Sequence, residues 1–181
     1  MAIGFLALRL AAGGLLTGHG LQKLRGAFGG PGLEGTEGMT KALGLHPPRL
    51  NAQAIAWSET AGGAALALGA ATPLAAASLI AGQAVAMRKV HLPNGPWSSN
   101  GGYEYNVVLI AAAFALVAEG PGAISLDALI GKARWGNAVG LIALLGGIGA
   151  SYAVTEVGRR LAPPADAGSE GEDAAAGDPA V

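Results

Sequence analysis

Residues 3–21 read IGFLALRLAAGGLLTGHGL, and residues 52–70 read AQAIAWSETAGGAALALGA. Each stretch is about long enough to cross a bilayer, because a hydrocarbon core of about 30 Å needs about 20 helical residues. Each also contains one charged residue, Arg9 in the first and Glu59 in the second. A charge at the centre of a membrane helix costs about 2.5–3.5 kcal/mol on translocon scales. Opposite charges on neighbouring segments therefore predict a helix bundle in which the two side chains neutralise each other.

The composition is typical of a polytopic membrane protein. Of the 181 residues, 51% are hydrophobic and 13% are charged, whereas soluble domains carry about 25% charged residues. The formal net charge of −1 provides no basic field, so no nucleic-acid partner is predicted. The absence of cysteine excludes disulfides, thiol nucleophiles and cysteine-ligated iron–sulfur or zinc sites.

Further apolar stretches at residues 72–90, 101–119 and 137–156 bring the candidate spans to five. Only Ala71-Thr72-Pro73 separates the second span from the third, which predicts a tight antiparallel hairpin because proline fits the first turn of a helix. We therefore predict an all-α fold: a polytopic transmembrane helix bundle with four core helices plus a fifth C-terminal span.

The same pattern divides the chain into three parts. Residues 1–127 form the predicted four-helix membrane domain, and residues 128–160 hold a short amphipathic segment and the fifth span. Residues 161–181 are rich in Ala, Pro, Gly and acidic residues, which predicts a disordered tail. The Gly-rich stretch 26–50 and the turn-rich stretch 91–100 are predicted to be loops outside the membrane.

The placement of lysine and arginine predicts the orientation in a multi-pass arrangement. With five spans, eight basic residues fall in loops on one side, whereas only Lys132 and Arg134 fall on the other. Because cytoplasmic loops carry the excess of Lys and Arg, we expect the N-terminus outside the plasma membrane and the C-terminus in the cytoplasm.

One face of the first span combines charge with small residues. Its members recur at steps of four and three along the helix: Arg9, Gly13, Leu16, Gly20 and Lys23. Glycine on such a face lets another helix approach closely, and Glu59 lies on a similar glycine-lined face of the second span. Arg9 and Glu59 thus form a structural ion pair that fixes helix register, or a proton or ligand site. Alternatively, Arg9 reaches the nearby interface alone.

A second polar cluster is expected at one membrane face. His19 and Lys23 are neighbours on the first span, His91 ends the third span, and Glu104 opens the fourth. The first and third spans run parallel, so these side chains are expected at the same face. Two histidines and a carboxylate can bind a divalent metal or relay protons. No H-x-x-H or H-E-x-x-H spacing is present, so no metal is predicted, and the alternative is a polar cluster that caps helix ends.

Two smaller features predict local contacts. Gln83, in the middle of the third span, is expected to form a hydrogen bond to another helix. Ser125-Leu126-Asp127 suits an N-cap for an amphipathic segment at residues 128–134.

Several of these residues together resemble the DoxX family. Leu8-Arg9-Leu10 followed by GHGLQKL at 18–24 is similar to its first-helix signature, and Glu59 followed by Gly62-Gly63 resembles its second helix. GGYEY at 101–105 resembles the opening of its fourth helix, and GPGAISLD at 120–127 resembles the sequence after that helix. The resemblance covers residues 2–127 and implies a small integral membrane protein of the bacterial inner membrane with four core helices.

The resemblance also implies a link to redox physiology, since the related DoxD-like group includes subunits of thiosulfate:quinone oxidoreductase. We expect a non-catalytic subunit or scaffold of a membrane redox or oxidative-stress assembly, with a membrane or soluble oxidoreductase as partner. One alternative is a thiosulfate:quinone-type subunit that uses the charged residues and histidines named above, and another is a small-solute or proton carrier. No cofactor is predicted, and a bound quinone is the alternative. The sequence does not decide whether the protein is an enzyme.

Overall fold

The computed structural model describes residues 2–163, which contain helices and no β-strand. The predicted all-α fold is therefore confirmed for this part of the chain. The helices of its first half are α1 (Ala2–Arg25), η1 (Ala27–Gly29), α2 (Gly32–Ala42), α3 (Pro48–Trp57), the π-helical η2 (Ser58–Gly62) and α4 (Gly63–Leu68). Because α3, η2 and α4 follow one another without a break, they form one continuous helix.

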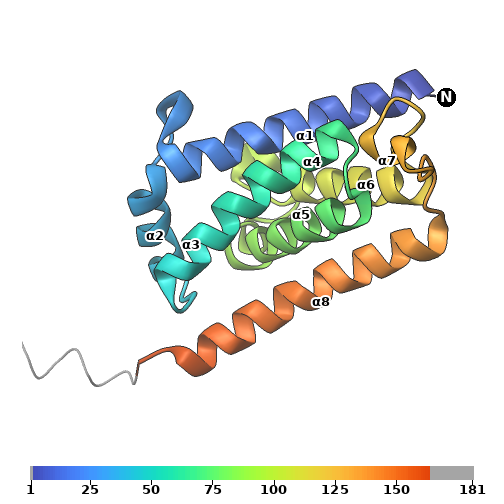
Figure 1. Cartoon of the computed structure of the whole chain (residues 1–181). Coiled ribbons are helices and arrows are strands. Elements are labelled where there is room, and N and C mark those ends of the chain that lie inside the picture. Colours follow the sequence, from blue (N-terminus) through green and yellow to red (C-terminus); the bar gives the residue numbers. More distant parts are fainter. Residues whose placement is uncertain (1, 164–181) are drawn as a thin grey trace, which may run out of the picture.

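The second half begins after a tight turn. Its helices are α5 (Thr72–Ala86), the π-helical η3 (Met87–His91), η4 (Leu92–Asn94), η5 (Ser98–Asn100), α6 (Glu104–Ala118), α7 (Leu126–Leu129) and α8 (Asn137–Leu161). α1 packs along α4 and η2, while α5 packs against α6 and α8 (Figure 1). Leu16, Leu66, Leu79 and Leu116, from α1, α4, α5 and α6, meet in the buried core.

The structure corrects two predicted segments. The stretch 26–50 is not only a loop, because it contains α2, which packs on α1 and α3. Thr40 is buried in α2, and its hydroxyl donates to the Pro48 carbonyl at 2.8 Å, a contact that sequence pattern does not reveal. The segment predicted at 128–134 is shorter and earlier, since α7 ends at Leu129. Most of the predicted disordered tail, from residue 164 onward, lies outside the described residues.

All five predicted spans coincide with helices, but their length and hydropathy differ. Within residues 2–163, only α8 is both long and apolar enough to cross a membrane by length and composition. α6 is apolar but has only 15 residues. Large apolar side chains are nonetheless exposed along several helices, among them Leu15 on α1, Val108 on α6 and Leu145 on α8. Such outward apolar surface is typical of contact with lipid or with a partner.

Glycine lets the backbone of α1 touch the neighbouring helix. A Cβ atom on Gly13 would lie 2.5 Å from the Ala67 amide nitrogen, and one on Gly20 would lie 2.3 Å from the Thr60 amide nitrogen. From the opposite side, a Cβ on Gly63 would lie 2.6 Å from the Thr17 amide nitrogen. These positions have no room for a side chain. The predicted packing of the two glycine-lined faces is therefore confirmed.

Asp127 holds the predicted hairpin between α4 and α5. Its carboxylate accepts hydrogen bonds from the amides of Ala71 at 2.7 Å and Thr72 at 2.9 Å, and from the Trp135 indole at 3.1 Å. Ser125 caps α7 as predicted, since its hydroxyl accepts from the Ala128 amide at 3.2 Å. Asp127 instead caps the start of α5, a role that its local sequence does not indicate.

The hydrogen bonds to Asp127 make its charge state relevant to folding. Burial alone would raise the pKa of the Asp127 carboxyl, but hydrogen bonds from Thr72, Trp135 and Ala71 outweigh burial and hold the pKa below its usual value. A carboxyl with a lowered pKa in the folded state contributes stability above its unfolded pKa of about 4. That contribution is lost as the pH falls through the folded-state value.

The glycine contact predicts a contrast between adjacent residues. We expect Gly13→Ala to lower the free energy of unfolding by about 1–3 kcal/mol, because the added methyl group overpacks a backbone contact. Gly14→Ala is the matched control, since nothing lies within 4 Å of its Cβ position. It should be neutral or stabilising, because alanine favours helix by up to about 1 kcal/mol. Thermal unfolding in mild detergent tests both, and equal effects would contradict the proposed close approach.

We expect Asp127→Asn to destabilise the protein at neutral pH by about 1.5–3 kcal/mol, the range for hydrogen bonds to a charged group. As the pH falls below about 4, the variant should lose less stability than the wild type does. Thermal unfolding at a series of pH values measures both effects. An unchanged pH profile would show that Asp127 does not carry this dependence.

Candidate functional site: a polar cavity between the helices

A cavity of about 250 Å³ lies between the helices of the bundle, close to the glycine contact of α1. Its apolar lining includes Leu16, Ile55 and Val85. Its ionisable and amide side chains come from α1, η2, α5, η3 and α6: His19, Lys23, Glu59, Gln83, His91, Tyr105 and Asn106. Ligand pockets commonly combine a mainly apolar wall with a few polar groups, in volumes from about 300 Å³ upward. The cavity has such a lining but lies slightly below this range of volumes, so it suits only a small ligand with a polar end.

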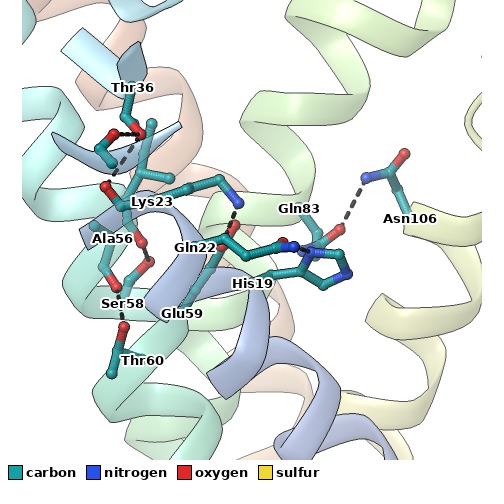
Figure 2. A network of polar contacts seen from close by, with 12 residues as sticks. His19, Gln22, Lys23, Thr36, Ala56, Ser58, Glu59, Thr60, Gln83 and Asn106 are labelled. Atoms are coloured by element: carbon teal, nitrogen blue, oxygen red, sulfur yellow. Dashed lines mark hydrogen bonds and ion pairs between the residues drawn. The ribbon is translucent and has the colours of Figure 1, made fainter. Parts of the chain in front are cut away.

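Lys23 and Glu59 form the charged contact of the cavity. The Lys23 ammonium donates to the Glu59 carboxylate at 2.5 Å, joining the last turn of α1 to η2 (Figure 2). The two side chains are 21% and 10% exposed, respectively. Gly20 places α1 against Thr60, one residue after Glu59, so the glycine contact brings the charged partners within reach. Mutual neutralisation permits both charges to lie in this largely buried position.

A pair of amides joins α5 to α6 on another side of the cavity. The buried Asn106 side chain donates to Gln83 at 2.8 Å (Figure 2). This confirms the predicted hydrogen bond between Gln83 and another helix, with Gln83 as the acceptor. Asn106 was not predicted from the sequence, although an amide beside the apolar run of α6 is a signal that could have identified it.

The two predicted histidines both line the cavity. His91 Nδ1 lies 2.7 Å from the Gly101 carbonyl and must donate to it, since a carbonyl only accepts. His19 Nδ1 lies 3.0 Å from the Gln22 side-chain oxygen (Figure 2). Each histidine is thereby held by one ring nitrogen.

Glu104 is not part of this lining, so the predicted cluster is only partly assembled. Its carboxylate instead accepts hydrogen bonds from Ser98, from the amide at 2.8 Å and from the hydroxyl. Glu104 thus stabilises the connector before α6. Among the described residues, no group of three or more His, Cys, Asp and Glu side chains is arranged to hold a metal ion.

The predicted ion pair between Arg9 and Glu59 is wrong. Arg9 lies fourteen residues before Lys23 in α1, which separates them by about 21 Å at 1.5 Å per residue. Arg9 is 3% exposed and donates to the Ile124 carbonyl, while its Nε and Nη1 atoms have no hydrogen-bond partner among the described residues. Its guanidinium lies against Gly69 at the C-terminal end of α4, where a helix dipole favours a cation.

Two π-helical segments carry residues of the cavity. Glu59 lies in η2, and His91 is the last residue of η3. π-Helical turns are rare within helices and occur frequently at functional sites. No feature of the sequence predicted them, because they differ from an α-helix only in the hydrogen-bond register of one turn. Their position on two neighbouring helices supports a binding role for the cavity.

Exposed apolar side chains on several helices, a largely buried charge pair and a polar cavity are features expected of a small helical membrane protein. The DoxX family model matches residues 4–92, from α1 into η4. Residues 4–92 therefore form a DoxX family domain, which confirms the resemblance over that part of the chain, whereas the motifs at 101–105 and 120–127 lie outside the match. All of the cavity's ionisable and amide residues except Tyr105 and Asn106 fall within the match. No curated protein and no solved structure matched this chain.

The Lys23–Glu59 contact predicts a non-additive pair of substitutions. Lys23→Met should lower the free energy of unfolding by about 3 kcal/mol, because it leaves a buried carboxylate unpaired. Adding Glu59→Gln should recover most of that loss, since the unpaired charge is then removed. Denaturant or thermal unfolding in detergent provides the double-mutant cycle.

The exposed pair of Arg49 and Glu37 provides the matched control, with a separation of 2.9 Å and side chains 58% and 34% exposed. Arg49→Met should change the stability by less than about 1 kcal/mol. If the effects of Lys23→Met and Glu59→Gln were simply additive, the charged contact would not have the assigned energetic role.

Proposed function

We propose that this protein is a non-catalytic membrane subunit of a redox or oxidative-stress assembly, and that it holds a small polar-headed ligand in the cavity. The observation that carries the proposal is the cavity itself, with Lys23 and Glu59 beside an apolar wall. The DoxX domain at residues 4–92 supports the redox setting.

The chemistry of the lining supports a binding role rather than an electron-transfer role. Histidine, lysine, glutamate and amide side chains bind, orient and move protons, but they are not the usual carriers of electrons. The sequence contains no cysteine, so no thiol accepts or donates electrons in this chain. A membrane or soluble oxidoreductase partner would supply the redox centre.

The proposed location is the bacterial inner membrane, with several spans and a cytoplasmic C-terminus. The distribution of Lys and Arg supports this orientation. Exposed apolar side chains on α1, α6 and α8 support contact with lipid. A reporter that is active only in the cytoplasm should therefore be active when it is fused to the C-terminus.

Purification of the full chain from native membranes in mild detergent tests the proposal. We expect a flavin- or quinone-dependent oxidoreductase to copurify, and we expect the separated chain to show no quinone reduction. The Lys23→Met/Glu59→Gln variant should still bind this partner but lower the activity of the assembly, because it changes the ligand site alone. Arg49→Met/Glu37→Gln, which neutralises an exposed pair, is the control.

Other outcomes would overturn the proposal. Quinone reduction by the isolated chain would assign it a catalytic role. Collapse of a pH gradient in liposomes that depends on Glu59 would indicate a carrier instead.

A membrane subunit of a thiosulfate:quinone-type oxidoreductase is the second candidate. The cationic Lys23 beside His19 and an apolar wall favours it, because an anion or a quinone head group would suit that environment. Under this alternative, His19→Ala and His91→Ala would abolish thiosulfate-dependent quinone reduction by the isolated chain. Arg9→Ala would not act at the cavity, since Arg9 does not line it.

A further inference from the structure

A second, basic groove lies away from the polar cavity, where η3 meets the C-terminal half of α8. It has a volume of about 740 Å³. Its charged and aromatic lining consists of His46, Arg88, Lys89, Tyr152, Glu156 and Arg159. We use the name basic groove for this set. None of these residues lines the polar cavity.

The cations of the basic groove exceed its anions. Glu156 is bound by both Arg159 and Arg160, each at 2.8 Å. No carboxylate among residues 2–163 lies within ion-pair distance of Arg88 or Lys89. The groove therefore keeps positive charge that its described residues do not neutralise.

The Arg88 side chain is already positioned. Its guanidinium lies 3.6 Å from the centre of the Tyr152 ring, and it donates a long hydrogen bond to the Ser151 hydroxyl at 3.4 Å. A planar guanidinium binds phosphate through two parallel hydrogen bonds, and prior positioning reduces the entropy lost on binding.

An apolar groove continues from the basic groove between α3 and α8. A cavity of about 320 Å³ shares His46 and Ala153 with the basic groove and adds Ala54, Val154 and Val157. A further cavity of about 200 Å³ shares Ala54 and Val154 and extends to α5. A charged site thus runs into a long apolar channel on a membrane protein.

We propose that this combined surface binds one anionic phospholipid, with its phosphate at Arg88 and Lys89 and an acyl chain along α3 and α8. Basic pockets between membrane helices on the cytoplasmic side bind the head groups of anionic lipids, and this is the side on which the basic loops are predicted to lie. A free phosphate would use the cations but leave the adjoining apolar channel without a role. The continuity of the two surfaces therefore favours a lipid.

Native mass spectrometry of the delipidated full chain in mild detergent tests the head-group site. Phosphatidylglycerol should bind more tightly than phosphatidylcholine, and Arg88→Gln/Lys89→Gln should weaken the phosphatidylglycerol complex by about tenfold or more. Lys132→Gln/Arg134→Gln, which removes the same charge from the opposite loop, should change it little. Lys89→Gln alone is the second variant, because Lys89 is exposed and its loss should not impair folding.

A separate substitution tests the apolar channel. Ala54 is exposed and lines both apolar cavities, so Ala54→Phe should block the acyl chain and weaken lipid binding with the cations intact. Unchanged lipid binding by this variant would overturn the acyl-chain assignment. Equal thermal stabilisation by inorganic phosphate and by phosphatidylglycerol would show that the site takes a free anion instead.

The acidic residues beyond Ala162 provide the competing occupant: Asp166, Glu170, Glu172, Asp173 and Asp178. A full-length variant with all five changed to their amides should bind phosphatidylglycerol as the wild type does. If only this variant bound the lipid, the acidic segment would be the occupant and the proposal would fail.

Discussion

Direct contact between the backbones of α1 and the α3–η2–α4 helix is the constraint on which the rest of the structure depends. At Gly13, Gly20 and Gly63 the two helices approach so closely that a Cβ atom would overlap the opposite backbone. Helices in lipid gain little from burying apolar side chains against one another, so close van der Waals packing must hold them together. This approach also sets the distance between the two helices at Lys23 and Glu59. The same glycines therefore determine both the packing and the geometry of the cavity.

The buried charges are separated along the bundle, and each is stabilised by a different device. Lys23 and Glu59 neutralise each other at the cavity. At the α4–α5 turn, Arg9 lies against Gly69 at the end of α4, and Asp127 accepts amide hydrogen bonds at the start of α5. A cation at a helix C-terminus and an anion at a helix N-terminus both complement the helix dipole. The turn therefore provides a favourable field for each charge without an ion pair between them.

Sequence periodicity could predict the helices, the glycine-lined faces and the hairpin, because these follow from residue spacing along one segment. It placed His19, Lys23 and His91 together, since residues at the ends of parallel helices share a face. It paired Glu59 with the wrong cation because Arg9 and Lys23 lie on the same face of α1, and only the axial offset between the helices distinguishes them. Asp127 and Asn106 depend on contacts between elements distant in sequence. The π-helical turns depend on hydrogen-bond register, for which the residues give no local signal.

Neighbouring residues of η3 line two different candidate sites. Arg88 and Lys89 line the basic groove, whereas Val90 and His91 line the polar cavity. Because a helix turns by about 100° per residue, residues two positions apart in η3, such as Lys89 and His91, lie on nearly opposite sides of the helix. No residue lines both the basic groove and the polar cavity, so substitutions at Lys89 and at His91 should perturb different sites. A shared effect on both would therefore indicate displacement of η3 itself rather than loss of a direct contact.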